Sequence, residues 1–227
     1  MEDHRATISA ITFDVYGTLV QFHEAVEQVL AYITNDLGID VSVPTLRAEF
    51  RATQGSLQRE ATWSPYKEVL KRGLKLTLEH RGLPYHPEYG ERLVMMISDA
   101  RPFSEVPAAL EVLQRHARLI FISNTDDDMI ERNLAHLPIT PDLVVTAEEA
   151  KMYKPAHGIF RYAWARAGVR PATTVHVAAG FHHDIEPAHA LGVRRVWINR
   201  RGETGDQRFA PYEELPDLAG LPLLLGL

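Results

Sequence analysis

The sequence predicts an α/β fold, a doubly wound parallel sheet with a helical region inserted after its first strand. Five short apolar runs are mostly continuous, as in parallel strands that are buried on both faces. Amphipathic helical stretches separate the last four runs, and such alternation is typical of this fold class. Roughly a hundred residues separate the first run from the second, far more than one crossover needs.

The elements follow from these patterns in chain order. The apolar runs predict strands at 8–13, 119–122, 143–146, 175–178 and 196–198. The interval after the first strand predicts helices at 24–37, 43–53, 66–81 and 87–99, punctuated by Gly and Pro. Further helices are expected at 129–136, 157–167 and 185–191, whereas the apolar tail 213–227 is not assigned to an element.

The insertion divides the chain into two expected regions. Residues 1–18 and 102–227 are expected to form the α/β core, and residues 19–101 a helical cap. Open α/β sheets bind ligands at the carboxyl ends of their strands. A cap inserted there is expected to cover the site and exclude water.

Composition excludes several classes of function. The 227 residues are 45% hydrophobic and carry a formal net charge of −6, which argues against a nucleic-acid partner. The absence of cysteine excludes disulfides, a thiol nucleophile and cysteine-ligated metals. No apolar run reaches the roughly 18 residues of a membrane span, and the acidic start, residues 1–5, is unlike a signal peptide. The expected location is the cytoplasm, and a homodimer is possible.

The first candidate site residues follow the first predicted strand. Asp14 stands where a buried strand meets the mouth of the sheet, which exposes its carboxylate to a ligand. Gly17 permits a tight turn after Tyr16, and the amides of such a turn can hold an anion. The Thr18 hydroxyl can hydrogen-bond the Asp14 carboxylate. Capping of a turn is the alternative interpretation of Asp14.

Polar residues also follow the next two strands. Ser123 and Asn124 end the second strand, where helix capping is an equally good interpretation. Lys154 is expected to point toward the strand ends, and Pro155 to occupy the first position of the next helix. Lys151 is interpreted as a surface residue.

The fourth strand leads to His183 and Asp184. Asp184 is expected to open the following helix, where it can cap that helix and also reach the site. Four of the eleven histidines lie in 176–189, but their spacing fits no recognised zinc site. The acidic run 126–128 suits the start of a helix and is interpreted as solvated.

These strand-end groups, in the order Asp, Ser-Asn, Lys-Pro and Asp, resemble the four motifs of the haloacid dehalogenase superfamily, over nearly the whole chain. Residues 14–19 are similar to the L-2-haloacid dehalogenase branch, since phosphatases usually have a second Asp where this chain has Tyr16. Residues 176–184 resemble a subgroup with a His-Asp pair in motif four, which includes an enzyme that opens azetidine-2-carboxylate. Phe50-Arg51 resembles the segment that carries the dehalogenases' arginine.

The resemblance implies a metal-independent hydrolase with an aspartate nucleophile, acting on a small 2-substituted carboxylic acid. A carboxylate such as Asp14 can displace a leaving group at saturated carbon, which gives an ester. Lys154 is expected to keep Asp14 ionised, and Asp184, with His183, to activate the water that hydrolyses the ester. The substrate is expected to contact residues that come from the cap and from two strand ends: Tyr16, Gly17, Thr18, Arg51, Ser123 and Asn124.

No metal or other cofactor is expected. Phosphoryl transfer would need a divalent cation, and magnesium prefers carboxylate oxygens. Superfamily phosphatases take one such ligand from the end of strand four, where this chain has Ala178, Ala179 and Gly180. A phosphatase that holds magnesium through Asp14 and Asp184 alone remains an alternative.

Two departures from the dehalogenase pattern affect the expected substrate. Ala179 and Phe181 stand where dehalogenases have the Ser and Asn that help to place the hydrolytic water. The substrate need not be a simple haloacid. An azetidine-2-carboxylate-type ring hydrolase and a catalytically silent binding protein are further alternatives.

Overall fold

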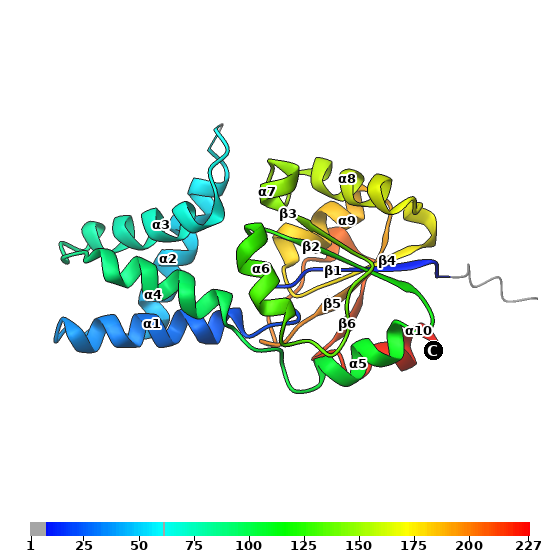
Figure 1. Ribbon diagram of the computed structural model, residues 1–227, viewed down its shortest axis with the longest axis horizontal. Helices are drawn as coiled ribbons and strands as arrows, with labels where there is room; N and C mark the ends of the chain where they lie inside the picture. The colour runs from blue at the N-terminus through cyan, green and yellow to red at the C-terminus, as the bar shows by residue number, and fades with distance from the viewer. Residues whose placement is uncertain (1–7, 61) are drawn as a thin grey trace, which may run out of the picture.

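The computed structural model describes residues 8–60 and 62–227. The interpretation of residues 1–5 as unlike a signal peptide therefore lies outside the described residues. Figure 1 shows an α/β core and, beside it, a layer of helices formed by the part of the chain that is coloured from blue through cyan to green. Within the described residues, no helix is long and apolar enough to cross a membrane.

The core contains a six-stranded sheet in the order β3-β2-β1-β4-β5-β6, in which every neighbouring pair is parallel. The central strand β1 is completely buried, as its apolar sequence predicts. The register places Thr12 of β1 beside His176 of β4. The strands are β1 (Ala10–Phe13), β2 (Arg118–Ser123), β3 (Leu143–Thr146), β4 (Thr174–Ala178), β5 (Arg194–Ile198) and β6 (Glu213–Leu215).

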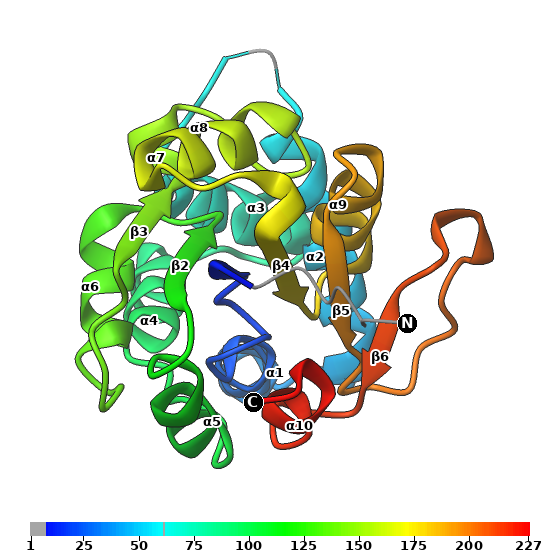
Figure 2. The same cartoon turned by 90° about the vertical axis from the view of Figure 1, so that its right-hand side faces the viewer.

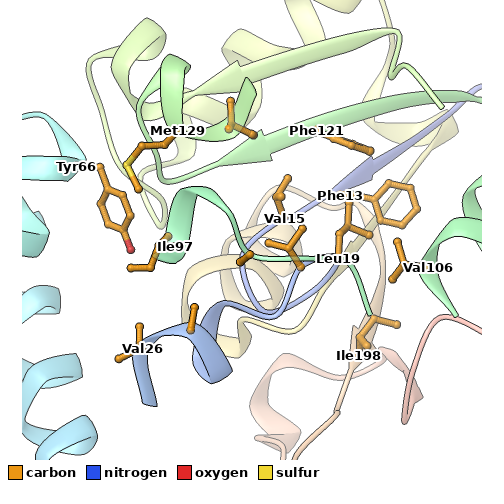
Figure 3. Close-up of a cluster of buried hydrophobic side chains, with 14 of the residues drawn as sticks. Phe13, Val15, Leu19, Val26, Tyr66, Ile97, Val106, Phe121, Met129 and Ile198 are labelled. Atoms are coloured by element: carbon orange, nitrogen blue, oxygen red, sulfur yellow. The ribbon is translucent and has the colours of Figure 1, made fainter. Parts of the chain in front are cut away.

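Helices cover both faces of this sheet (Figure 2). On one face, α8 and α9 pack on a cluster that includes Ile120, Ile122 and Phe160. On the other face, α5, α6 and α10 close a larger cluster around Phe13, part of which Figure 3 shows. The core helices are α5 (Val106–Leu113), α6 (Asp127–Leu134), α7 (Ala147–Ala150), α8 (His157–Ala167), α9 (Glu186–Ala190) and α10 (Leu221–Leu225).

The four helices inserted between β1 and α5 bury apolar faces against one another and share the larger cluster with the core. Ser42 caps the second helix by accepting a hydrogen bond from the Thr45 amide at 3.4 Å. These helices are α1 (Phe22–Asp36), α2 (Val43–Gln58), α3 (Tyr66–His80) and α4 (Pro87–Ser98).

Two neighbouring segments connect the inserted helices to the core. The Gln21 amide donates to the Arg101 carbonyl at 2.9 Å, and the Phe103 amide donates to the Leu19 carbonyl at 3.0 Å. Val20 and Pro102 form an antiparallel bridge between the same segments. The chain thus leaves the core and returns to it along one hydrogen-bonded pair of segments.

The α/β fold with a doubly wound sheet is confirmed, and the structure adds elements that the sequence pattern did not predict. The tail that was not assigned contains β6 and α10. Two further helices were not predicted: α5, which precedes β2, and α7, which follows β3. The edge strand β6 has only three residues, too few to show a period. The eight residues of α5 and four of α7 are likewise shorter than the window in which helical periodicity is clear.

Candidate active site

Three charged side chains from different strand ends meet at the mouth of the sheet. The Lys154 Nζ lies 2.7 Å from Asp14 Oδ1 and 2.6 Å from Asp184 Oδ1. All three side chains are buried, with at most 7% of any of them exposed. Because parallel strands end at the same edge of a sheet, residues 140 and 30 positions from Lys154 arrive at one place.

The three charges change one another's pKa. Burial raises the pKa of Asp14, and the charge of Asp184 adds to this, while Lys154 and the Thr18 hydroxyl oppose it. Burial also favours a neutral Asp184, but Lys154 and a hydrogen bond from His176 outweigh it and hold the pKa of Asp184 below its usual value. Burial disfavours the Lys154 ammonium, yet the two carboxylates raise the pKa of Lys154 above its ordinary value.

Asp14 is oriented by the turn that follows it. The Thr18 hydroxyl donates to Asp14 Oδ2 at 2.6 Å and accepts a hydrogen bond from the Ala179 amide at 2.8 Å. Gly17 adopts φ +84°, and a Cβ there would lie 3.1 Å from His23 Nε2, so glycine suits this position on two counts. The turn fixes Asp14 with one oxygen toward Thr18 and the other toward Lys154.

Only part of this turn is free to bind an anion. The Gly17 amide donates to the Val20 carbonyl at 3.0 Å, and the Thr18 amide donates to the Val15 carbonyl at 3.2 Å. The amides of Val15 and Tyr16 have no hydrogen-bond acceptor within the part of the chain that the structure describes. Of these two residues Tyr16 lines the cavity, so its amide, rather than those of Gly17 and Thr18, is available to an anion.

Asn124 and a local turn hold the backbone of Lys154. The Asn124 side chain accepts from the Lys154 amide at 2.7 Å and donates to the Lys154 carbonyl at 3.0 Å. The expectation that Pro155 begins the next helix is wrong, because the Ala156 amide donates to the Tyr153 carbonyl and closes a turn around Pro155. Helix α8 begins two residues later, at His157.

Asp184 does not open or cap a helix as expected. It lies within the π-helical turn η2 (Phe181–Ile185), and Oδ1 faces Lys154 and His176 rather than a helix terminus. A Cβ on Gly180 would lie 2.5 Å from Asp184 Oδ2, so glycine makes room for the carboxylate. The turn therefore directs a residue that resembles a helix cap inward to the site.

A cavity of about 490 Å³ opens beside these residues, between the core and the inserted helices. The lining combines strand-end residues with side chains of α1 and α2 and of the loop that follows β5. Of the residues predicted for the site, those that line the cavity are Asp14, Tyr16, Gly17, Arg51, Asn124, Lys154, His183 and Asp184.

Thr18 and Ser123, both predicted to contact substrate, are not among the residues that line the cavity. Thr18 is fully buried, and its hydroxyl is occupied by hydrogen bonds to Asp14 and from the Ala179 amide. Ser123 is fully buried in β2, and its hydroxyl has no hydrogen-bond partner in the described chain. Tyr16 contributes its ring but not its hydroxyl, which donates to Asn133 and pairs with Thr125, each at 3.0 Å.

His183 lines the cavity next to Asp184 as a neutral imidazole. Burial lowers the pKa of His183 to about 4, although the neighbouring charge of Asp184 opposes this shift. The Nδ1 atom is buried and has no hydrogen-bond partner among the described residues. Because His183 lines the cavity, its imidazole is close enough to interact with a molecule there.

Sequence reasoning missed several residues at the site. Arg47, Arg200, Arg201 and His23 also line the cavity, and nothing in their spacing separates them from surface residues. His176 was placed in the stretch that resembles the His-Asp subgroup and among histidines that fit no zinc site, but its hydrogen bond to Asp184 was not predicted. The sequence did offer one signal for His176: it is a polar residue in the middle of a strand that is buried on both faces.

The donor set fits a metal ion poorly. Magnesium requires several hard oxygen ligands, and the Lys154 ammonium occupies the place between the two carboxylates. Tyr16 and Ala179 supply no third carboxylate. Within residues 8–60 and 62–227, no group of three His, Cys, Asp or Glu side chains could hold a metal ion.

Comparison with known proteins agrees with this geometry. An (S)-2-haloacid dehalogenase, 4A, of Burkholderia cepacia is 25% identical over 212 residues, covering 91% of this chain and 90% of the relative. The crystal structure of a dehalogenase with an intermediate complex superposes with a TM-score of 0.85 at 23% identity, over 97% of this chain and 98% of that chain.

The L-2-haloacid dehalogenase of Xanthobacter autotrophicus with covalently bound chloropropionic acid superposes with a TM-score of 0.81 at 18% identity, over 96% of this chain and 98% of that chain. These likenesses to solved structures show a shared fold. The family described as haloacid dehalogenase-like hydrolase matches residues 8–192. The chain therefore belongs to the haloacid dehalogenase-like hydrolases.

Proposed function

We propose that this protein hydrolyses a small 2-substituted carboxylic acid, such as an (S)-2-haloacid, through an ester on Asp14 and without a metal ion. The ion-paired group of Asp14, Lys154 and Asp184 beside the cavity is the observation that carries the proposal. Such a group offers an ionised nucleophile whose counter-charge is a lysine. The haloacid dehalogenases among its relatives, matched over most of their length, support the substrate class.

In the first half of the reaction, an Asp14 oxygen attacks the substituted carbon and the leaving group departs with the bonding electrons. The amide of Tyr16, which lines the cavity and has no acceptor among the described residues, is suited to hold the substrate carboxylate. Arg51, from helix α2, lines the same cavity and can stabilise a departing anion. Asn124 was expected to contact the substrate, but both ends of its amide hold the Lys154 backbone, so its contribution is to position Lys154.

In the second half, water attacks the carbonyl carbon of the Asp14 ester; the bond from that carbon to the ester oxygen breaks, the 2-hydroxy acid leaves with this oxygen and a proton, and the carboxylate is restored. Asp184 Oδ1 already accepts hydrogen bonds from Lys154 and His176, which leaves Oδ2 to take the proton from water. The imidazole of His183, which lines the cavity and is neutral at pH 7, can orient the same water. Asp184 and His183 thereby take over the task of the Ser and Asn that dehalogenases have at the positions of Ala179 and Phe181.

A substrate panel tests the proposal directly. (S)-2-chloropropionate, fluoroacetate, azetidine-2-carboxylate and p-nitrophenyl phosphate are each incubated with the enzyme, with and without a chelator. We expect halide release from the haloacids, or opening of the azetidine ring to an amino 2-hydroxy acid, at a rate that the chelator leaves unchanged. Release of phosphate alone, abolished by chelator and restored by magnesium, would instead establish a phosphatase. Binding of the acids without turnover would indicate a silent binding protein.

A further inference from the structure

His176 occupies an unusual place for a polar side chain. It lies in the middle of β4, is completely buried, and has the ring of Phe160 edge-on at 5.3 Å between centroids. A buried imidazole without partners would cost several kcal/mol, so its contacts indicate why it is tolerated here. Both ring nitrogens have a partner: Nδ1 lies 2.8 Å from Thr12 Oγ1, and Nε2 lies 3.1 Å from Asp184 Oδ1.

One tautomer satisfies both contacts. Asp184 is an ionised acceptor, so the His176 proton belongs on Nε2, where it is donated to Oδ1. Nδ1 then accepts the hydrogen of the Thr12 hydroxyl, whose other acceptor, the Val175 carbonyl, lies at 3.4 Å. The result is a directed chain of hydrogen bonds from Thr12 through His176 to Asp184.

These hydrogen bonds give the two oxygens of Asp184 different surroundings. Oδ1 receives Lys154 from one side and His176 from another, whereas Oδ2 lies over Gly180 next to the cavity. Lys154 alone would hold Oδ1 from one side only, and the same ammonium also contacts Asp14. His176 comes from a strand, and a strand fixes direction more firmly than the loop that carries Lys154.

We propose that His176 is a positioning residue that anchors Asp184 Oδ1 so that Oδ2 faces the water that hydrolyses the Asp14 ester. The inference rests on the proposed function, since it gives His176 a task in the second half of that reaction. Thr12 fixes the tautomer of His176, as the outer partner of a functional imidazole commonly does. His176 itself touches neither substrate nor reacting atoms.

The test compares three variants of the full chain. His176→Leu removes both hydrogen bonds, whereas His176→Gln places an amide N–H near the position of Nε2. Val175→Ala, in the same buried strand, is the control for lost packing, because its side chain has no part in the hydrogen-bond chain. Single turnovers with (S)-2-chloropropionate give separate rates for formation and decay of the ester on Asp14.

We expect His176→Leu to slow decay of the ester by about tenfold or more, with formation changed by less than about threefold. His176→Gln should recover most of the decay rate. Val175→Ala should lower stability but keep the ratio of the two rates. Equal slowing of both steps in His176→Leu, or no rescue by Gln, would overturn the assignment.

A substrate-free measurement separates this inference from the proposed function. Carbon-13 NMR of labelled aspartate follows the titration of Asp184, which is faced by Lys154, His176, Asp14 and His183. His176→Leu should raise the pKa of Asp184, and His176→Gln should restore it. An unchanged pKa would overturn the inference even in an active enzyme. Absence of any ester in the wild type, with the pKa shift present, would count against the proposed function alone.

Discussion

At the scale of single residues, Lys154 determines how the site is charged. Its ammonium contacts one oxygen of Asp14 and one of Asp184, so two carboxylates are accommodated in a buried place with a single cation. Two unpaired carboxylates at this depth would each tend to take up a proton. The lysine therefore supplies the counter-charge that a metal ion supplies in other hydrolases.

Replacement of the nucleophile gives the simplest test at this scale. Asp14→Asn should lower kcat/KM with (S)-2-chloropropionate at least a thousandfold, since an amide is a poor nucleophile. The fold should persist, because the amide oxygen can still accept from Thr18 or Lys154. Halide release and circular dichroism measure the two effects. Activity above about a tenth of wild type, without deamidation to Asp, would contradict Asp14 as nucleophile.

The pH dependence follows from the directions of the pKa shifts. The raised pKa of Asp14 means that the ionised nucleophile is lost, on acidification, at a higher pH than an ordinary aspartate near about 4. The raised pKa of Lys154 means that its side chain stays protonated up to and beyond about pH 10. His183, with a pKa of about 4, stays neutral through the neutral range.

A profile of kcat/KM against pH should therefore be flat from about pH 7 to pH 9, with an acid limb whose midpoint lies above about 4. Because the raised pKa belongs to a group that must be ionised, activity falls with acidification and not with alkalinisation. An inflection near 6.5 that disappears in His183→Gln would show instead that His183 titrates in the neutral range.

At the scale of elements, Asp126 connects the core to the inserted helices. Both of its oxygens accept backbone amides at the start of α3, from Tyr66 at 2.7 Å and from Lys67 at 2.9 Å. It is 1% exposed, so the expectation that the acidic run 126–128 is solvated is wrong at its first residue. Asp126 thus caps a helix that belongs to the other region of the molecule.

Removal of this carboxylate should weaken the connection. Asp126→Ala leaves two amides at the N-terminus of α3 without their acceptors, which should lower the free energy of unfolding by about 2 kcal/mol. Urea denaturation measures the change. The matched control is Asp128→Ala, which removes an exposed ion pair with Lys67 and should cost less than about 1 kcal/mol. Equal effects of the two substitutions would show that Asp126 has no special role.

The elements also show what the sequence could and could not predict. Continuous apolar runs identify the five long strands, since burial on both faces leaves little else in their sequences. The same argument places Asp14, Lys154 and Asp184 at one edge. It cannot say which atoms face the cavity: the turn after Asp14 turns Thr18 away, and the π-helical turn directs Asp184 inward. Such details depend on the backbone geometry of turns, which the spacing of apolar residues in the sequence does not predict.

His176 and Asp126 illustrate a second limit. A polar residue within a buried strand and an acid at the start of a helix each have a common local interpretation, as a strand residue and a solvated cap. Their actual partners are Asp184 and the amides of α3, and the latter lie some 60 positions away in the chain. Contacts of this kind arise from the packing of distant segments, which local sequence patterns do not report.

At the scale of the whole molecule, the cavity is completed by both regions. The core contributes the ion-paired group, and helix α2 contributes Arg51 across the cavity. The two regions are joined by the hydrogen-bonded segments at Val20 and Pro102 and by the contact of Asp126 with α3. The cavity therefore depends on residues of both regions being in place.

The proposed mechanism requires Asp14 to form a covalent ester, and one turnover in oxygen-18 water tests this directly. With enzyme in excess over (S)-2-chloropropionate, the oxygen delivered to the first product comes from Asp14, and water then repairs the carboxylate. Mass spectrometry should find the label in the peptide that contains Asp14 and an unlabelled 2-hydroxy acid. Label in the product of the first turnover, with Asp14 unlabelled, would show that water attacks the substrate itself and would contradict the mechanism.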